Sequence, residues 1–191
     1  MRDPQDADDI LVDAVKAGRE SAFEILMRRH TPAIRNLIAR YFRDHSRVDD
    51  LAQETFVKAY FSLADYRGEA PLVFWLKRIA VRLCLDELTR SKKESSHFVS
   101  MGGSAEETIM ESSGIAGLRN SDAEEQMHLR LWVDKILGSL PPVDRMILIL
   151  TEGEGYQDKE VARLTGLSLA NVKVRAFRLR RRLRKQWQGL G

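Results

Sequence analysis

The sequence predicts an all-α protein with two small helical domains joined by a flexible acidic linker. Apolar residues recur at three- and four-residue spacing from about Asp8 to Lys93, and again from about Ala123. Residues 94–122 lie between these stretches, are rich in Ser and Gly, and show little apolar periodicity. No run alternates apolar and polar residues as a strand does. We therefore expect domains at residues 8–93 and 123–187, separated by the linker 94–122.

Breaks in the helical pattern place the first domain's connections. Gly18, residues 44–46 and residues 67–69 interrupt the apolar spacing. In the second domain, Leu140-Pro141-Pro142 ends one helix and starts the next, because proline is tolerated in the first helical turn. Residues 153–155 then break the chain again.

The linker has one alternative interpretation, which is a long surface loop inside a single domain. Loops of this length are uncommon in compact domains, so the linker interpretation is favoured. The linker region is also distinct in charge, since Glu94 to Glu125 contains seven acidic residues and one arginine.

The composition favours a globular protein of the cytoplasm. The chain has 191 residues, of which 43% are hydrophobic and 31% charged. No segment has the roughly 18 apolar residues of a membrane span. The N-terminus lacks a signal-peptide pattern, and the single cysteine, Cys84, excludes an internal disulfide framework. The net charge of +3 hides a basic C-terminal segment, because eight of the thirteen residues from Lys173 to Lys185 are Lys or Arg.

A helix-turn-helix is predicted just before and within this basic segment. The motif needs a small residue where its helices cross, a glycine in the left-handed turn, and an apolar residue that seats the second helix. Ala162, Gly166 and Val172 meet these three requirements, and Ser168 is a suitable N-cap for the second helix.

The second helix of the motif has two predicted faces. Its inward stripe comprises Leu169, Val172, Ala176, Leu179 and Leu183. Its outward face offers cations, an amide and apolar atoms to a DNA major groove, and consists of Ala170, Asn171, Lys173, Val174, Phe177, Arg178 and Arg181. A solvated basic helix end is the alternative, but the position of these residues on the second helix of the motif favours DNA binding.

Another two-faced helix is predicted around residues 48–60. Ala52, Phe56, Ala59 and Leu63 can serve the domain core. The opposite side shows acids followed by apolar groups, at Asp50, Gln53, Glu54, Val57 and Phe61. This composition is typical of a protein docking surface. A metal or general-acid site at Asp50 and Glu54 is the alternative, but no histidine or third carboxylate is spaced to complete it.

The following loop and helix combine aromatic and cationic residues. Rings beside Arg and Lys can hold unstacked bases and their phosphates. Trp75 and Leu76 fit better as core residues at helical spacing. The loop and Arg82 are therefore the better candidates for nucleic-acid contact.

In combination, these segments resemble the extracytoplasmic-function (ECF) sigma factors of bacterial RNA polymerase. The sequence from Asp49 to Tyr60 is similar to the family's polymerase-docking helix, and residues 66–80 are similar to its loop and helix for the promoter's −10 element. Residues 139–141 and the helix-turn-helix resemble its −35-reading domain.

The resemblance implies a transcription initiation factor that is not an enzyme and needs no cofactor or metal. Its partners would be core RNA polymerase, promoter DNA and a membrane-anchored anti-sigma factor, without membrane insertion of this chain. The implied polymerase-binding residues are Asp49, Asp50, Gln53, Glu54, Val57 and Phe61. The implied −10 residues are Arg67, Gly68, Glu69, Ala70, Lys77, Arg78 and Arg82, and the implied −35 residues are the outward face given above.

Two departures from the family pattern suggest an altered promoter preference. Arg82 stands where relatives often have Asn, and Val174 stands where they often have Ser. The rival functions are a dimeric helix-turn-helix repressor or activator, a nucleic-acid enzyme using the acids at 49, 50 and 54, and a structural adaptor without a DNA role. The repressor leaves the docking helix unexplained, the enzyme lacks ligand spacing, and the adaptor leaves the basic face unexplained.

Overall fold

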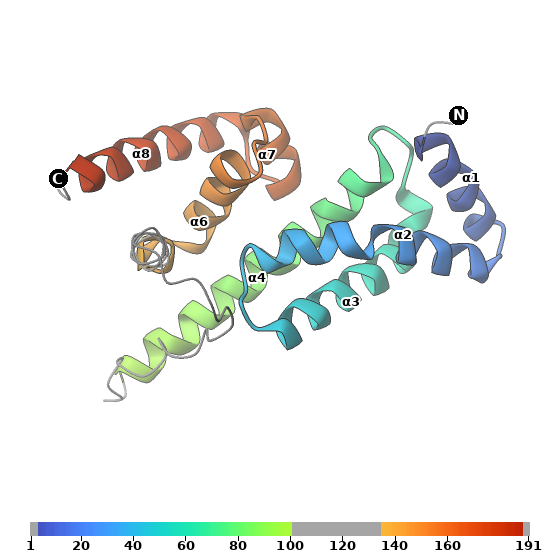
Figure 1. Cartoon of the computed structure of the whole chain (residues 1–191), viewed down its shortest axis with the longest axis horizontal. Helices are drawn as coiled ribbons and strands as arrows, with labels where there is room; N and C mark the ends of the chain where they lie inside the picture. The colour runs from blue at the N-terminus through green and yellow to red at the C-terminus, as the bar shows by residue number, and fades with distance from the viewer. Residues whose placement is uncertain (1–3, 101–134, 189–191) are drawn as a thin grey trace, which may run out of the picture. The chain divides into compact units, whose positions relative to one another are not determined.

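The computed structural model describes residues 4–100 and 135–188 of the chain. Every regular element in these two stretches is helical, as the sequence predicts (Figure 1). The first stretch contains α1 (Pro4–Lys16), α2 (Glu20–Ala39), α3 (His45–Ser62), the 3-10 helix η1 (Leu63–Asp65) and α4 (Leu72–Ser100). The second contains a helical segment at 135–139, then α6 (Pro142–Leu148), the π-helical turn η2 (Ile149–Gly153), α7 (Asp158–Thr165) and α8 (Leu169–Gln188).

Several helix boundaries fall at or next to the predicted breaks, although His45 and Ser46 of the break predicted at 44–46 already belong to α3. Gly18 lies between α1 and α2, and the loop 67–69 precedes α4. Asp44 caps α3, because its carboxylate accepts a 2.9 Å hydrogen bond from the backbone N–H of Ser46. Pro142 occupies the first turn of α6, as expected for a proline in a helix.

Helix α4 extends beyond the predicted start of the linker. It continues past Lys93 to Ser100. The remaining linker residues, 101–122, lie outside the described part of the chain. The division into 8–93, 94–122 and 123–187 therefore stays a prediction.

The chain forms two compact units. Among the described residues, the first contains residues 4–87 together with Gln157–Leu169, and the second contains residues 88–100 and 135–156 together with residues 170–188. Helix α7 thus groups with the first unit, while α8 belongs to the second from Ala170 onward.

The core of the first unit is built on α2, which contacts both α1 and α3. Ile34 and Ile38 of α2 are fully buried, as are Ala59 of α3 and Val81 of α4. The apolar spacing that predicted these helices is therefore the spacing of the residues that they bury.

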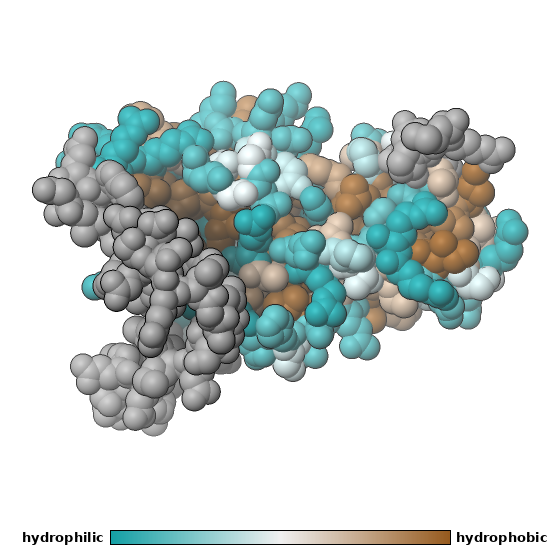
Figure 2. All heavy atoms as spheres, in the orientation of Figure 1, coloured by the Kyte–Doolittle hydropathy of each residue, from teal (hydrophilic) through white to brown (hydrophobic). Residues whose placement is uncertain are grey.

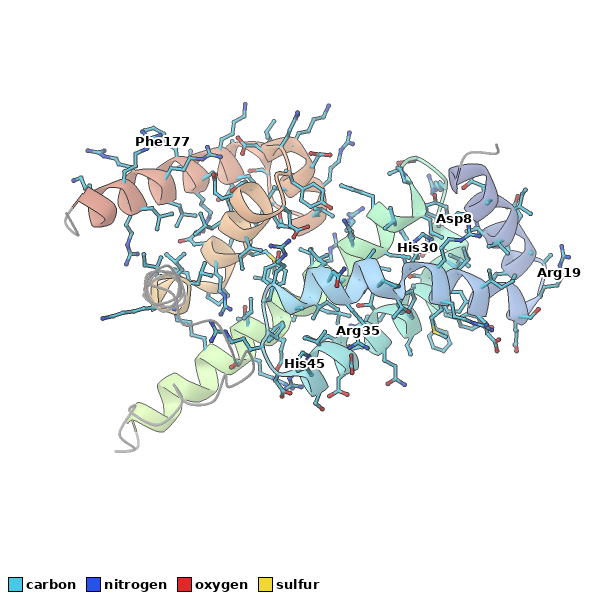
Figure 3. All side chains as sticks on the ribbon, in the orientation of Figure 1. Asp8, Arg19, His30, Arg35, His45 and Phe177 are labelled. Carbon is cyan, nitrogen blue, oxygen red and sulfur yellow. The ribbon has the colours of Figure 1, made fainter. Side chains whose placement is uncertain are left out.

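A buried polar network joins α1 to α2. Asp8 is only 5% exposed, and its carboxylate is hydrogen-bonded to the Nε2 atom of His30 at 2.9 Å (Figure 3). The other carboxylate oxygen of Asp8 accepts a hydrogen bond from Arg29. Because a buried carboxylate is costly without such partners, the network fixes how these two helices meet.

The second unit contains α6, η2 and α8. Met146, Ile147 and Leu150 form a buried apolar run through α6 and η2. Two ion pairs connect α6 and η2 to α8. Arg175 pairs with Asp144 at 2.6 Å, and Arg180 pairs with Glu152 at 2.8 Å. They lie on different sides of α8, because residues 175 and 180 are about 140° apart around a helix.

Candidate nucleic-acid and protein interfaces

Helix α3 has the two faces that its sequence predicts. Ala52, Phe56 and Ala59 are buried, so they form the predicted core side. On the opposite face, all the predicted docking residues are exposed, namely Asp49, Asp50, Gln53, Glu54, Val57 and Phe61. Phe61 is 81% exposed, an unusual position for a large apolar ring on a protein surface. The helix therefore has an exposed face that is both acidic and apolar.

Two of the acids on this face form ion pairs within the chain. Asp49 contacts Arg35 of α2 at 2.8 Å, and Glu54 contacts Lys58 at 3.2 Å. Both pairs are well exposed, so each contributes little to folding stability and can rearrange when a partner arrives. Asp50 forms no ion pair within the described residues and is available as it stands.

Aromatic contacts extend this face onto α2. The ring centroids of Phe23 and Tyr60 lie 5.0 Å apart in an edge-to-face arrangement, and those of Tyr60 and Phe61 lie 5.7 Å apart. Phe23 lies outside the predicted surface, because no local sequence pattern links Phe23 of α2 to α3. Figure 2 shows brown, hydrophobic areas among teal, hydrophilic residues on the face in view.

The loop before α4 is held at its base by Tyr66. Its hydroxyl donates a 2.8 Å hydrogen bond to the carbonyl of Ala70, and its ring lies 5.5 Å from that of Trp75. Tyr66 is itself buried, while the loop residues Arg67, Gly68 and Glu69 are exposed and Ala70 is half-buried. Gly68 has φ +73° with nothing within 4 Å of a Cβ at that position, so glycine is favoured there by backbone conformation rather than by space.

The structure brings together two of the three predicted α4 cations. Arg78 and Arg82 are exposed and lie one turn apart on the same side of the helix. Lys77 points to a different side, is half-buried and already interacts within the protein. The predicted core role is confirmed for Leu76, which is buried, whereas Trp75 is half-buried.

The turn between α7 and α8 has the predicted backbone. Gly166 adopts the left-handed conformation with φ +78°, and its N–H donates to the carbonyl of Ala162, so α7 ends there. At the start of α7, the N–H of Gln157 donates to the Glu160 side chain at 2.9 Å.

Helix α8 presents the predicted outward face. All seven residues predicted to contact DNA are exposed, namely Ala170, Asn171, Lys173, Val174, Phe177, Arg178 and Arg181. Phe177 is 65% exposed and points away from α6 (Figure 3). Val172, Ala176 and Leu179 are buried, which confirms the inward stripe at these positions.

Leu169 is a wrong prediction of the inward stripe, because it is 39% exposed. It is the first residue of α8, at the turn, where the packed part of the helix has not yet begun. Leu183, the last member of the stripe, is half-buried.

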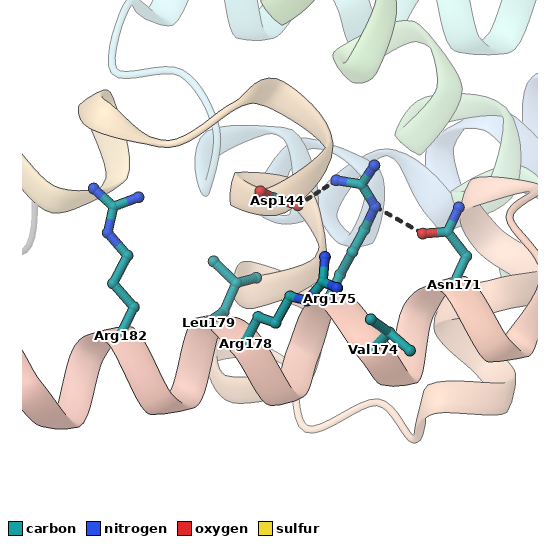
Figure 4. A pocket seen from close by; sticks show the side chains of 7 residues that line it. All are labelled: Asp144, Asn171, Val174, Arg175, Arg178, Leu179 and Arg182. Atoms are coloured by element: carbon teal, nitrogen blue, oxygen red, sulfur yellow. Dashed lines mark hydrogen bonds and ion pairs between the residues drawn. The ribbon is translucent and has the colours of Figure 1, made fainter.

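One polar network on α8 was missed by sequence reasoning. Arg175 donates from Nε to the side-chain oxygen of Asn171 at 2.7 Å and from Nη1 to Asp144 of α6 at 2.6 Å (Figure 4). These three residues line an open hollow together with Val174, Arg178, Leu179 and Arg182. Helical periodicity placed Asn171 outward, but it carried no information on the contact between Arg175 and Asp144, which are far apart in the chain.

Within the residues that the structure describes, no helix is long and apolar enough to cross a membrane. In the same residues, His, Cys, Asp and Glu side chains do not gather in groups of three that could hold a metal ion.

Two family models match the chain, and the surfaces described above lie within the matched ranges. Residues 26–94 match the family described as Sigma-70 region 2, and residues 130–183 match Sigma-70, region 4. The first match contains α3 and the loop before α4, and the second contains α6, α7 and most of α8.

Similar proteins cover the whole chain. RNA polymerase sigma-H factor of Pseudomonas aeruginosa is 30% identical, and the match covers 97% of this chain and 96% of the relative. ECF RNA polymerase sigma-E factor of Escherichia coli K12 is 32% identical over 193 residues, covering 96% of this chain and 95% of the relative. The sigma-E factor of Salmonella typhimurium matches at the same identity and coverage.

Solved structures share the fold of this chain. The structure of CnrH in complex with the cytosolic domain of CnrY matches with a TM-score of 0.59 at 26% identity, covering 96% of this chain and 98% of that chain. The sigma factor RpoE of Bartonella quintana, in complex with the anti-sigma factor NepR, shares the fold with a TM-score of 0.57 at 22% identity, covering 87% of this chain and 96% of that chain. The chain therefore belongs to the ECF sigma factors of the sigma-70 family.

Proposed function

We propose that this sigma factor binds core RNA polymerase through α3 and directs it to promoters through the loop 67–70, α4 and α8. One observation carries the proposal. The region 2 match contains a helix whose outward face is acidic and apolar, and the region 4 match contains a helix whose outward face is cationic and apolar. The first composition suits a protein partner and the second suits DNA.

The α3 surface supplies the polymerase contact. Val57 and Phe61 provide exposed apolar area that gains free energy when it is covered, while Asp50 and Glu54 provide charge that selects a basic partner surface. The polymerase-binding set is Asp49, Asp50, Gln53, Glu54, Val57 and Phe61.

The loop and α4 supply the −10 contact. Gly68 and Ala70 allow a flipped base to approach the backbone closely, since neither carries a large side chain. Arg78 and Arg82 lie on one side of α4, where they can bind the phosphates of the displaced strand. Lys77 contributes less than these two, because it is half-buried and already engaged.

The outward face of α8 supplies the −35 contact. Lys173, Arg178 and Arg181 can bind base edges or phosphates in the major groove. Val174 and Phe177 can contact thymine methyl groups, because both are apolar and exposed.

An anti-sigma factor regulates the chain by covering these surfaces. CnrH is bound to the cytosolic domain of CnrY, and RpoE to the anti-sigma factor NepR. We infer that the antagonist of this chain is a membrane-anchored protein. Its cytosolic domain would bind the chain and hold it in the cytoplasm.

Run-off transcription from genomic fragments tests the proposal. Purified core polymerase is assayed with and without the chain. We expect discrete transcripts only when the chain is present. An identical transcript pattern with and without it would contradict a role in initiation.

A further inference from the structure

Two hydrogen bonds hold the two ends of the loop 67–70. At the end of the loop, the hydroxyl of Tyr66 donates to the carbonyl of Ala70 at 2.8 Å. At its start, the ammonium group of Lys16 donates to the carbonyl of Tyr66 at 2.7 Å. A carbonyl lies in one rigid plane with the N–H of the following residue. The two bonds therefore restrain the peptide plane from which the loop departs and the one through which it returns to α4.

The carbonyl that Lys16 binds stands where the chain leaves a helix. Tyr66 is the C-cap of η1, and its backbone is extended, with φ −71° and ψ 118°. A carbonyl at a helix end lacks a helical partner, and an ammonium group forms a charge-assisted hydrogen bond with it. The bond is partly buried, although Lys16 as a whole is exposed.

Lys16 belongs to a helix whose own position is fixed. It is the last residue of α1, which contacts η1 as well as α2 (Figure 1). The buried carboxylate of Asp8 holds α1 on α2 through its bonds to Arg29 and His30. Helix α1 precedes the range 26–94 that matches Sigma-70 region 2, so this support for the loop comes from outside the matched range.

We propose that Lys16 is a positioning residue for the loop 67–70. By holding the carbonyl of Tyr66, it keeps the start of the loop in the conformation that receives a flipped −10 base. Less of the loop then has to be ordered when the promoter strands separate. This inference rests on the proposed function, because it assumes that the loop contacts −10 DNA.

Arg19 provides a matched control. It is an exposed cation three residues after Lys16, and its side chain forms no ion pair or hydrogen bond within the described residues. Arg19→Met and Lys16→Met each remove one positive charge from neighbouring positions. Only Lys16→Met also releases the carbonyl of Tyr66.

The experiment uses holoenzyme reconstituted from core polymerase and the full chain. Run-off transcription is measured on a duplex promoter and on the same promoter with its −10 region already melted. The readout is the ratio of the activity on the duplex to the activity on the melted template. Gly68→Leu is the reference variant, because leucine rarely adopts φ +73° and its side chain obstructs the approach of a base.

We expect Lys16→Met to lower this ratio about fivefold, an effect of the size that one partly buried hydrogen bond supplies. Lys16→Arg should restore most of the ratio, because a guanidinium also donates and keeps the charge. Arg19→Met should leave the ratio as in wild type. In a Gly68→Leu background, Lys16→Met should lower the ratio no further, since the loop it positions has already lost its function.

The salt dependence of promoter binding separates positioning from direct contact with DNA. If Lys16 bound a phosphate itself, Lys16→Met would reduce the slope of log K against log salt concentration by roughly one unit. A positioning role leaves the slope unchanged, and a reduced slope would overturn the proposal.

Two further results would overturn it. An equal loss of activity on both templates would show that Lys16 only stabilises the fold, and melting curves would report the matching loss of stability. A wild-type ratio in Lys16→Met, with a lowered ratio in Gly68→Leu, would show that the loop acts without Lys16. If Gly68→Leu itself keeps the wild-type ratio and −10 base preference, the −10 contact of the proposed function fails, and this inference fails with it.

Discussion

At the scale of single residues, burial controls the chemistry of Cys84. The side chain is fully buried, and burial raises its pKa from 9.0 to about 12, with a smaller contribution from the charge of Glu87. The folded chain therefore keeps the thiol protonated where the unfolded chain loses the proton.

This difference makes stability depend on pH above the ordinary cysteine range. The folded state binds more protons than the unfolded state between pH 9.0 and about 12, so the free energy of unfolding falls as pH rises through that window. We expect a loss of about 1.4 kcal/mol per pH unit from this group. Denaturant unfolding at pH 8 and pH 10 measures it, and Cys84→Ala should have the smaller pH dependence. Equal pH dependence in both proteins would show that the thiol ionises freely in the fold.

Tyr66 is the second residue with a testable role. Tyr66→Phe removes the hydrogen bond to the Ala70 carbonyl and should destabilise the chain by about 1 kcal/mol. Because the base of the loop 67–70 then loosens, transcription from duplex promoters should fall more than from promoters that are already melted. Matched templates measure this, and an equal loss on both would separate Tyr66 from strand opening.

At the scale of helices, the outward face of α3 is the proposed contact with core polymerase. Asp50→Lys with Glu54→Lys should abolish co-purification with core polymerase while helicity and melting temperature stay nearly unchanged, since exposed substitutions usually change stability by about 0.5 kcal/mol. Asp13→Lys, an exposed reversal on α1, is the matched control and should bind normally. Retained binding by the double variant would exclude α3 as the docking surface.

The outward face of α8 gives a second test at this scale. If Arg181 contacts a phosphate, Arg181→Ala should weaken DNA binding about equally on all sequences. It should also reduce the slope of log K against log salt concentration by roughly one unit. Lys173→Ala or Arg178→Ala should cost about 1–3 kcal/mol on the cognate −35 site, if either reads a base. Salt titrations on cognate and random duplexes separate these effects. Unchanged affinity in all three variants would place the DNA on another face.

The sequence predicted what helical periodicity controls. The two faces of α3, most of the inward stripe of α8 and the left-handed Gly166 follow from local spacing, and the structure has all of them. Each residue of an α-helix is rotated by about 100° from the one before it, so the order of residues determines which of them share a face.

Contacts between residues that are far apart in the chain could not be predicted from helical periodicity. Asp144 meets Arg175, and Phe23 meets Tyr60, only because helices far apart in sequence pack together. The exposure of Leu169 and the continuation of α4 to Ser100 were also missed. Helical periodicity alone does not determine where a helix begins or ends.

At the scale of the whole molecule, the central claim is that one chain uses separate surfaces for polymerase and for DNA. A helix-turn-helix repressor would instead bind as a dimer on a two-fold operator. The two possibilities differ in the symmetry of the DNA site and in its dependence on polymerase.

DNase footprinting on a promoter found by run-off transcription tests this claim most directly. The chain is added alone, core polymerase is added alone, and then the two are combined. We expect one asymmetric footprint that spans the −35 and −10 elements and forms only with both proteins present. A symmetric footprint formed by the chain without polymerase would contradict the account.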